Sequence, residues 1–331
     1  MAIRVVQFGL GPIGQACVKV LLQKPGVELA GAIDIDPAKV GRDLGEVCGL
    51  RRSTGLIVRG DAEAALAAWR PHVVVHTTSS FLHRVEDQLA AIVRAGSCVV
   101  SSTEELFYPY ERDPEFCRRI DALAQQHGVA VVATGVNPGF AMDILPLTLT
   151  AACTQVQALR LTRVADASKR RLPFQQKIGA GLTLAQFRAK VRAGGFGHIG
   201  LRESALTVLR CLGWQADKFI ESIKPMLAAR RVTTPYLTVK KGQVTGIHQT
   251  LKCRQGTKTL LVFDWKMYVG APESYDRVEI KGDPPLTMNI AGGIFGDTGT
   301  IGALVNTIPK VLQAAPGLRS AVDLPVPHAF L

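Results

Sequence analysis

A short glycine-rich segment near the N-terminus has the spacing of a nucleotide-binding turn. Residues 9–14 are Gly-Leu-Gly-Pro-Ile-Gly, and they follow an apolar, β-branched run at residues 3–8. Gly9 permits a tight turn, Gly11 allows the backbone to approach a pyrophosphate, and Gly14 allows the following helix to pack closely on the strand. A turn that needs its glycines only for packing is the alternative.

The same segment begins a helix whose N-terminus can bind phosphate groups. Pro12 and Ile13 occupy its first turn, where proline is well tolerated and where backbone N–H groups favour an anion. Asp34 ends the next predicted strand, at the distance where a carboxylate accepts hydrogen bonds from ribose hydroxyls and repels a 2′-phosphate. The pattern predicts NAD as the cofactor, with NADP as a second option because Lys39 and Arg42 lie close enough to soften that repulsion.

Small polar residues follow two further predicted strands. Thr77, Thr78 and Ser79 come after the strand at residues 72–76 and suit a loop against the nicotinamide ribose or the pyrophosphate. Ordinary helix capping is the alternative for this loop. Asn137 follows another strand and could present its amide to the nicotinamide carboxamide, unless its segment is only a tight turn.

Two adjacent carboxylates, Glu104 and Glu105, follow the buried strand predicted at residues 98–101. Ligands bind at the carboxyl ends of parallel strands, and adjacent residues of an extended segment point to opposite sides, so one of the two is expected to face the cleft. A partly dry site raises the pKa of a carboxyl group, which can then act as general acid or base near neutrality. Helix N-terminal charge or a surface ion pair is the alternative.

These residues lie on one alternating pattern of strands and helices over residues 1–139. Such alternation requires right-handed crossovers and a mostly parallel, doubly wound α/β sheet of the Rossmann type. The expected strands are 3–8, 27–33, 57–58, 72–76, 98–101 and 129–133, and the expected helices are 13–22, 61–69, 83–95 and 114–127.

The pattern changes after residue 138, and residues 140–295 are expected to form a second domain of α+β type with an open mixed or antiparallel sheet. We expect this domain to bind substrate and to dimerise. A C-terminal segment, 296–331, begins with an amphipathic helix and is expected to pack back on the Rossmann domain. In the second domain the expected strands are 157–164, 236–240, 246–254, 259–269 and 277–281, and the expected helices are 140–150, 183–193, 202–212 and 215–229.

Composition narrows the class of protein. The 331 residues are 47% hydrophobic and 20% charged, which excludes a disordered chain. No apolar stretch is long enough to span a membrane, no signal peptide precedes the first strand, and the seven cysteines are dispersed without metal-ligand spacing. We therefore expect a cytoplasmic protein with no metal site and no membrane partner.

The formal net charge of +12 is concentrated in one half of the chain. Residues 151–331 carry 25 Lys and Arg against 11 Asp and Glu, whereas residues 1–150 carry 14 against 16. The basic clusters are short and aromatic residues make up 6% of the chain. A solvated surface or steering of an anionic substrate is therefore favoured over nucleic-acid binding.

With these motifs in place, the chain resembles the 2,4-diaminopentanoate dehydrogenase family, which includes the native NAD(P)-dependent amine dehydrogenases and is distantly related to dihydrodipicolinate reductase. The resemblance implies homodimers that oxidatively deaminate an amine or diamino acid to a ketone and ammonia, with reduction of NAD(P), and that reductively aminate the ketone in reverse. The segments that carry it are GLGPIG at 9–14, AIDIDPAKVGRDLGE at 32–46, STEELFYP at 102–109, TGVNPGFAMD at 134–143, the stretch from Arg163 through FQQKIGAG, GHIGLRES at 197–204 and FGDTGTIGALVNTIP at 295–309.

The resemblance also implies roles for residues. The glutamate of the family's Ser-Thr-x-Glu-Glu-Leu-like segment is the catalytic acid and base; Glu104 aligns with it, and Glu105 is the fallback. Four further residues are candidates for substrate binding, with surface charge, structural hydrogen bonding or core packing as the competing interpretation. They are Arg163, Lys177 and His198, for a substrate carboxylate, and Phe140, as an apolar wall of the pocket.

Two alternative functions stay open at this point. The first is a dihydrodipicolinate-reductase-like enzyme that reduces an imine or a carbonyl without ammonia. Dihydrodipicolinate reductases carry an adjacent pair of histidines in the substrate domain, however, and no such pair occurs in this sequence. The second is a nicotinamide-binding regulatory protein whose basic half binds a partner.

Overall fold

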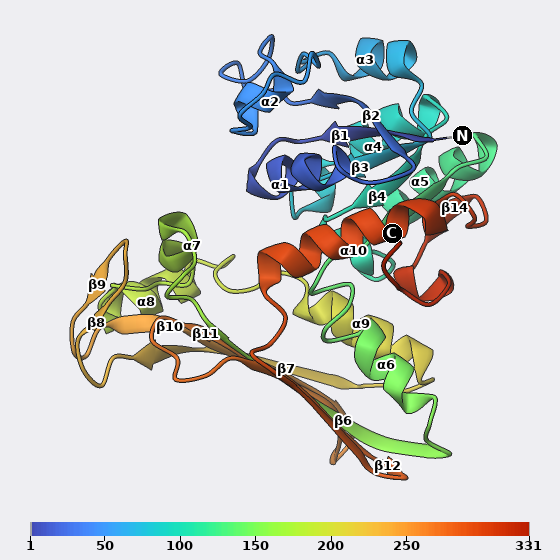
Figure 1. Ribbon diagram of the computed structural model, residues 1–331. Coiled ribbons are helices and arrows are strands. Elements are labelled where there is room, and N and C mark those ends of the chain that lie inside the picture. Colours follow the sequence, from blue (N-terminus) through green and yellow to red (C-terminus); the bar gives the residue numbers. More distant parts are fainter. Residues whose placement is uncertain (1, 331) are drawn as a thin grey trace. The chain divides into compact units, whose positions relative to one another are not determined.

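The computed structural model describes residues 2–330, which divide into two units (Figure 1). Unit 1 comprises the residues up to 140 and from 296 onward, and unit 2 comprises residues 141–295. Between residues 2 and 330, none of the helices has the length and apolar character that crossing a bilayer requires.

Unit 1 is built on a parallel sheet with the strand order β14-β5-β4-β3-β1-β2. Valine fills its central strands, and Val74, Val99 and Val131 are fully buried. Such continuous apolar runs are typical of strands covered by helices on both faces. The predicted doubly wound parallel sheet is confirmed. Its strands are β1 (Ile3–Phe8), β2 (Val27–Ile33), β3 (Val73–His76), β4 (Cys98–Ser101), β5 (Ala130–Ala133) and β14 (Gly317–Arg319).

The helices of unit 1 begin at residues suited to capping. Asp61 accepts a hydrogen bond from the backbone at the start of α3, and Asp113 does the same for α5, where Pro114 is the first helical residue. The strand expected at residues 57–58 forms only isolated bridges. The helices are α1 (Pro12–Leu21), α2 (Leu44–Val47), α3 (Ala62–Trp69), α4 (Glu86–Arg94) and α5 (Pro114–Gln126), with short 3-10 helices η1 (Leu82–Arg84), η2 (Glu104–Phe107) and η3 (Ala321–Asp323).

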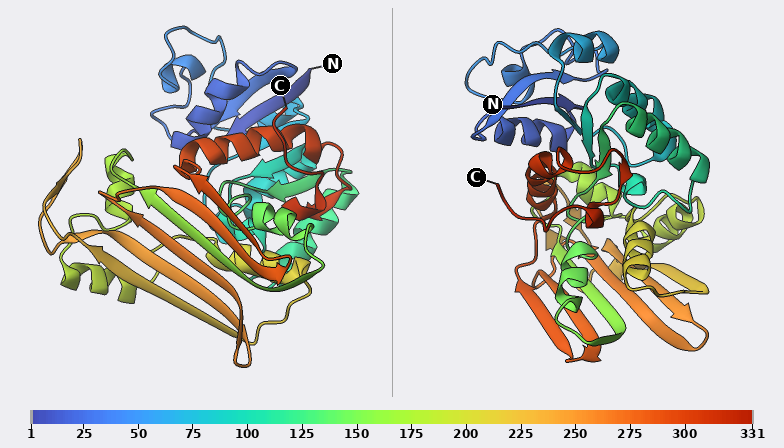
Figure 2. Two further views of the ribbon diagram at one scale, coloured as in Figure 1. Left: turned by 60° about the horizontal axis from the view of Figure 1, so that its bottom comes forward. Right: turned by 90° about the vertical axis from the view of Figure 1, so that its right-hand side faces the viewer.

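The C-terminal segment completes unit 1. Helix α10 (Gly296–Val311) buries Leu304, Val305 and Ile308 and packs against α1 and β4 (Figure 2). Strand β14 then extends the parallel sheet beside β5. The sequence pattern indicated the helix but not this strand, because three residues are too few to show a period.

Unit 2 contains a sheet with the strand order β13-β12-β6-β11-β10-β7, in which neighbours are antiparallel except for the parallel pair β6 and β11. The predicted mixed sheet is confirmed. The helix expected from residue 140 begins only at Ile144, because Asp143 caps it. The strands are β6 (Gln155–Asp166), β7 (Lys218–Leu227), β8 (Val232–Thr233), β9 (Thr238–Val239), β10 (Val244–Gln255), β11 (Lys258–Tyr268), β12 (Tyr275–Asp283) and β13 (Leu286–Ala291), and the helices are α6 (Ile144–Thr150), α7 (Leu172–Lys177), α8 (Leu184–Arg192) and α9 (Leu201–Cys211).

The helix predicted at residues 215–229 is wrong, because this segment contains the edge strand β7, antiparallel to β10. The apolar residues Phe219, Ile223 and Met226 recur with a spacing that also fits one face of a helix. Pro225 argues against a helix, since proline in a helix interior costs about 3 kcal/mol or more, whereas an edge strand tolerates it.

Candidate functional site

The glycine turn after β1 leaves room for a phosphate group. Gly9 has a φ of 91°, in the left-handed region, and a Cβ on Gly14 would lie 1.9 Å from the carbonyl oxygen of Gly9. This close approach holds the start of α1 against β1. A Cβ on Gly11, by contrast, would meet no described atom within 4 Å. The open space therefore lies beside Gly11, the N-cap of α1.

The N-terminus of α1 keeps its hydrogen-bond donors available. No side chain of the described residues caps it, and its first turn contains no acidic residue. Pro12, which has no N–H, occupies one of the positions where the helix leaves its donors unsatisfied. The strand order also reverses here, because β1 lies between β2 and β3, and ligands bind at such a point in open parallel sheets. The residues present therefore fit the pyrophosphate of a dinucleotide.

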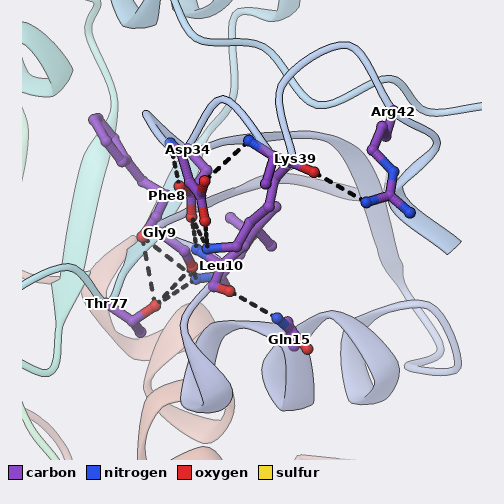
Figure 3. A network of polar contacts seen from close by, with 11 residues as sticks. Phe8, Gly9, Leu10, Gln15, Asp34, Lys39, Arg42 and Thr77 are labelled. Atoms are coloured by element: carbon purple, nitrogen blue, oxygen red, sulfur yellow. Dashed lines mark hydrogen bonds and ion pairs between the residues drawn. The ribbon is translucent and has the colours of Figure 1, made fainter. Parts of the chain in front are cut away.

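Asp34 is tied to the glycine turn by its own carboxylate (Figure 3). Its Oδ2 accepts a hydrogen bond from the backbone N–H of Leu10 at 2.6 Å, and its Oδ1 accepts one from the N–H of Asp36 at 2.9 Å. The residue is 8% exposed. The position at the end of β2 is the one where a carboxylate contacts the adenosine ribose.

The two cations expected near Asp34 have different partners. Nζ of Lys39 lies 3.3 Å from Oδ2 of Asp34 and 3.2 Å from Oδ2 of Asp36. Arg42 instead donates to the carbonyl oxygen of Ala38 at 3.0 Å and forms an ion pair with Glu46. Of this pair, Lys39 is therefore the cation placed against the predicted ribose-binding carboxylate.

The hydroxyl groups of the loop after β3 make contacts within unit 1. Oγ1 of Thr77 donates to the carbonyl oxygen of Gly9 at 3.0 Å, which ties this loop to the glycine turn. Oγ1 of Thr78 donates to Oε1 of Gln88 at 2.7 Å, and Oγ of Ser79 accepts a backbone N–H two residues on. Thr77 thus shapes the predicted pyrophosphate site, and Ser79 makes a contact within its own turn rather than the helix cap that was its alternative role.

Glu105 is buried, and both of its carboxylate oxygens have partners in unit 1. It is 7% exposed, its Oε2 accepts the backbone N–H of Leu82 at 2.9 Å, and its Oε1 lies 3.1 Å from Nη1 of Arg112. Its own backbone N–H donates to the carbonyl oxygen of Ser80 at 3.2 Å. The residue therefore joins the loop after β4 to the loop after β3.

Glu104 begins the short helix η2 and is half-buried between two buried neighbours, Thr103 and Glu105. The segment was expected to be extended, but it is a 3-10 helix. With about three residues per turn, adjacent side chains still point in different directions. The side chains of Glu104 and Glu105 are therefore in different environments at the carboxyl end of β4.

A buried histidine, which sequence analysis did not single out, supports these loops. His76 ends β3 and is fully buried; its Nδ1 lies 2.9 Å from Oγ of Ser101 and its Nε2 lies 2.8 Å from Oε1 of Gln88. Burial lowers the pKa of His76 to about 4, so the ring is neutral at pH 7. The backbone N–H of Thr103 also donates to Oγ of Ser101. His76 thus connects the ends of β3 and β4.

The loop after β5 is a tight turn. A Cβ on Gly139, whose φ is 129°, would lie 2.1 Å from the backbone nitrogen of Gly135, and the Asn137–Pro138 bond is cis. The N–H of Val136 donates to Oγ1 of Thr300, at the start of α10. Asn137 is 8% exposed within this turn. The structure therefore places Asn137 in a tight turn at the same sheet edge as Glu104.

In unit 2, four polar or aromatic side chains occupy facing positions on neighbouring strands. Asp276, Arg163, Trp265 and Gln249 follow one another across β12, β6, β11 and β10, and we call them the Arg163 row. Each is at most 6% exposed. The four strands are distant in the sequence, so only their pairing in the sheet brings these residues together. Of the four, only Arg163 was a candidate from the sequence.

Arg163 and Asp276 form a buried ion pair. Nη1 of Arg163 lies 3.3 Å from Oδ1 of Asp276, Nη2 of Arg163 donates to the carbonyl oxygen of Ile294, and Oδ2 of Asp276 accepts the N–H of Ile294 at 2.7 Å. Burial lowers the pKa of Arg163 and raises the pKa of Asp276, and the attraction between the two opposes both shifts. Among the described residues, Nη1 of Arg163, Oδ1 of Asp276 and Nε1 of Trp265 are buried without a hydrogen bond. The first two face each other in the ion pair, whereas Nε1 of Trp265, on the adjacent strand, is a buried donor without an acceptor.

His198 lies directly against this row. Its ring packs edge-on against Trp265, with 4.0 Å between ring centroids. Gln249 fixes its backbone, because Oε1 of Gln249 accepts the N–H of His198 at 2.8 Å and Nε2 donates to its carbonyl oxygen at 3.2 Å. The structure thus brings His198 and Arg163 into one neighbourhood.

The two remaining substrate-binding candidates lie elsewhere. Lys177 is exposed at the last residue of α7, outside the Arg163 row. Phe140 is half-buried at the end of unit 1, after the tight turn. Both substrate-binding roles stay predictions.

The thiols do not assemble into a site. The seven cysteines are free, and burial raises the pKa of Cys17 to about 12. Between residues 2 and 330, no group of three or more His, Cys, Asp or Glu side chains is placed to hold a metal ion.

Comparison with known proteins decides the family. The family profile described as 2,4-diaminopentanoate dehydrogenase C-terminal domain matches residues 140–331, and the profile described as dihydrodipicolinate reductase, N-terminus, matches residues 3–132. The chain belongs to the 2,4-diaminopentanoate dehydrogenase family. The resemblance seen in the sequence is confirmed, and the protein is an NAD(P)-dependent oxidoreductase acting on CH–NH2 groups.

Relatives match along the whole chain. The 2,4-diaminopentanoate dehydrogenase of Acetoanaerobium sticklandii is 30% identical over 99% of this chain and 95% of its own. The amine dehydrogenase of Streptomyces virginiae is 28% identical over 99% of this chain and 98% of its own. The solved structure of the amine dehydrogenase from Mycobacterium smegmatis is 25% identical, with a TM-score of 0.87 over 100% of this chain and 98% of that one.

Proposed function

We propose that this enzyme interconverts a carboxylate-bearing amine and the corresponding ketone. In the deaminating direction, the carbon that bears the amine gives a hydride to NAD(P) and the nitrogen loses a proton. Water then replaces the nitrogen, so that a ketone and ammonia are released. The reverse reaction is reductive amination. The observation that carries the proposal is the placement of Glu104 at the end of β4, two strands from the glycine turn after β1.

We propose Glu104 as the acid and base of this reaction. When bound, NAD(P) supplies the hydride acceptor at C4 of the nicotinamide. Glu104 takes the proton of the substrate ammonium, because only the neutral amine can release a hydride from its carbon. Glu104 passes this proton to solvent, so its carboxylate is ionised again when the iminium develops. It then deprotonates the water that adds to the iminium carbon, and in reverse it protonates the departing hydroxyl. Its negative charge also stabilises the developing iminium.

The contacts of Glu105 support this assignment. Both of its carboxylate oxygens are engaged, one by the N–H of Leu82 and the other by Arg112. A carboxylate whose two oxygens both have partners is poorly placed to exchange a proton with a substrate. Glu104, on the same short helix, is the glutamate that aligns with the family's acid and base.

We further propose that the Arg163 row binds the substrate carboxylate. The buried donors of Arg163 and Trp265 lie on adjacent strands, and a carboxylate can accept from both with its two oxygens. A buried donor left without an acceptor costs about 1–3 kcal/mol, so a substrate that supplies the acceptor gains affinity over one that does not. This supports an oxo acid or amino acid over a simple ketone or amine.

The proposal is tested by oxidation of NADH and NADPH with 4-oxopentanoate, with 2-amino-4-oxopentanoate and with uncharged 2-pentanone, each with and without excess ammonium. Ammonium-dependent oxidation that favours the two acids is expected. Oxidation without ammonium would instead identify a carbonyl or imine reductase. Equal turnover of 2-pentanone and 4-oxopentanoate would contradict carboxylate recognition by the Arg163 row.

We propose a homodimer as the working form, as the resemblance implies. The chain mass of 35.6 kDa sets the expectation for light scattering after size-exclusion chromatography. A particle of twice that mass is expected, and a monomer at micromolar concentration would contradict the proposal.

We also propose that the enzyme works in a reducing compartment such as the cytoplasm. Its free cysteines support this, because none of the seven forms a disulfide. Thiol titration of protein purified without reductant should return seven free thiols after unfolding.

A further inference from the structure

His76 is a polar residue at the end of an otherwise apolar strand. The other three residues of β3 are valines, and the side chain of His76 is as fully buried as theirs. A buried polar ring destabilises the fold unless its nitrogens have hydrogen-bond partners. Packing of β3 between its neighbours would be satisfied by a fourth apolar residue. The imidazole is therefore expected to have a task that depends on its hydrogen bonds.

The two ring nitrogens of His76 contact different elements. Nε2 lies 2.8 Å from Oε1 of Gln88, on α4, and 2.9 Å from Oγ1 of Thr78, in the loop after β3. Nδ1 lies 2.9 Å from Oγ of Ser101, the last residue of β4 and the one paired with His76 in the sheet. The ring thus connects the predicted cofactor-binding loop on one side with the end of β4 on the other.

Ser101 extends this connection to the residue before Glu104. Its Oγ accepts the N–H of Thr103 at 3.1 Å and donates to Oγ1 of Thr103 at 3.0 Å. The hydroxyl of Thr103, which is 1% exposed, donates in turn to the carbonyl oxygen of Ser79 at 2.8 Å. Thr103 is the N-cap of η2, whose first residue is Glu104. A chain of buried side chains therefore leads from the ring of His76 to the start of this helix.

We propose that His76 is a positioning residue for the reaction: through Ser101 and Thr103, it fixes the position from which Glu104 exchanges protons with the substrate. The hydrogen bonds of a 3-10 helix have poor geometry, so a helix of four residues does little by itself to fix its first side chain. A displacement of about 1 Å can lower a rate about 100-fold. The inference rests on Glu104 as the acid and base of the proposed function.

Two substitutions of His76 separate the contacts of the ring. The amide of H76N reaches about as far as Nδ1 and can keep the contact with Ser101, whereas the amide of H76Q reaches about as far as Nε2 and can keep the contact with Gln88. An amide can donate or accept, so each variant keeps its contact whichever ring nitrogen carries the proton in the wild type. S101A removes the connection itself. The matched control is S97A, at a second fully buried serine, whose Oγ donates to the carbonyl oxygen of Pro71 at 2.7 Å.

The purified full-length variants are compared in ammonium-dependent oxidation of saturating NADH and in urea unfolding. H76Q and S101A are expected to lower kcat by about ten- to a hundredfold, whereas H76N should stay within about threefold of the wild type. S97A should lose stability but keep its kcat. Both variants of His76 should be less stable than the wild type, so a difference in kcat between them reports positioning rather than stability.

Amide hydrogen exchange of the free protein provides a measurement that needs no substrate. Residues 102–107 are expected to exchange faster in H76Q and in S101A than in the wild type, and at the wild-type rate in H76N. In the double variant H76Q/E104Q, kcat should equal that of E104Q alone, because His76 acts only through Glu104.

The proposal is overturned by equal kcat in H76N and H76Q, by wild-type kcat in S101A, or by unchanged exchange of residues 102–107 in H76Q. A further loss of kcat on adding H76Q to E104Q would show that His76 acts elsewhere. Wild-type turnover of E104Q would refute the proposed acid and base and this inference together. An inactive E104Q beside fully active H76Q and S101A would refute this inference alone.

Discussion

The backbone N–H of Leu82 donates a hydrogen bond to Oε2 of Glu105 at 2.9 Å, so a carboxylate from the loop after β4 caps the short helix after β3. The N–H of Glu105 donates in turn to the carbonyl oxygen of Ser80. These paired contacts bind the two loops together within unit 1. Two adjacent glutamates are thereby given different environments, and this difference supports Glu104 as the acid and base.

Substitution of Glu105 should reduce stability in proportion to the contacts removed. E105Q keeps an oxygen that can accept the N–H of Leu82 and loses the partly exposed ion pair with Arg112, at a cost of at most about 1 kcal/mol. E105A leaves the buried N–H of Leu82 without its acceptor and should cost about 1–3 kcal/mol more. Urea unfolding of both variants and the wild type measures the difference.

One outcome of this unfolding experiment would contradict the role of Glu105. If E105A and E105Q unfold at the same urea concentration as the wild type, Glu105 does not join the two loops. R112M serves as a control that removes the ion pair and keeps the carboxylate of Glu105, and it should resemble E105Q more than E105A.

His76 should make the protein less stable in mild acid. Burial lowers its pKa to about 4 from the ordinary value of 6.5, so the unfolded chain binds a proton at a higher pH than the folded chain does. The stabilisation is complete above about pH 6.5 and is lost as the pH falls toward 4, by about 3 kcal/mol in total.

Chemical unfolding from pH 7.5 to 4.5 checks this assignment. H76Q should show a shallower loss of stability on acidification than the wild type, whereas the same substitution at the exposed His83 should leave the slope unchanged. Parallel slopes for H76Q and the wild type would contradict it.

Two glycines of the turn should respond differently to alanine. A Cβ at Gly14 would lie 1.9 Å from the carbonyl oxygen of Gly9, so G14A must displace α1 and should lower the melting temperature. A Cβ at Gly11 meets open space, so G11A should melt like the wild type but bind NADH at least about tenfold more weakly, because its methyl group occupies the approach to the pyrophosphate. Wild-type NADH affinity in G11A would place the pyrophosphate elsewhere.

Local spacing explains why so much of unit 1 could be predicted. The turn from Gly9 to Gly14 and the carboxylate of Asp34 lie within one βαβ unit, where chain geometry fixes their relation. The alternation of apolar strands with amphipathic helices likewise predicted the parallel sheet. Each of these features can be recognised from residues that are close together in the sequence.

The parts that could not be predicted depend on long-range pairing. Asp276, Trp265 and Gln249 join Arg163 only through strand register in unit 2. The structural contact of Glu105 depends on Leu82, 23 residues away on another loop. The segment around Pro225 was mistaken for a helix because its apolar spacing fits either element, and pairing with β10 decides between them.

Trp265 offers a clean test of carboxylate recognition. W265F removes the Nε1 donor but keeps a ring to pack against His198, and it leaves the Arg163–Asp276 pair intact. The KM for 4-oxopentanoate should rise about tenfold or more with little change in kcat, and turnover of 2-pentanone should not change. W214F, at a half-buried tryptophan outside the row, is the control. An equal effect on both ketones would assign Trp265 to packing alone.

The central claim is that Glu104 exchanges protons with the substrate. The most direct measurement is ammonium-dependent oxidation of NADH with the preferred oxo acid, made side by side for the wild type, E104Q and E105Q, together with NADH affinity for each. We predict that E104Q loses about 10²- to 10⁴-fold in kcat at unchanged NADH affinity, whereas E105Q keeps most of its turnover. Turnover of E104Q at the wild-type rate, or a greater loss in E105Q than in E104Q, would contradict the assignment.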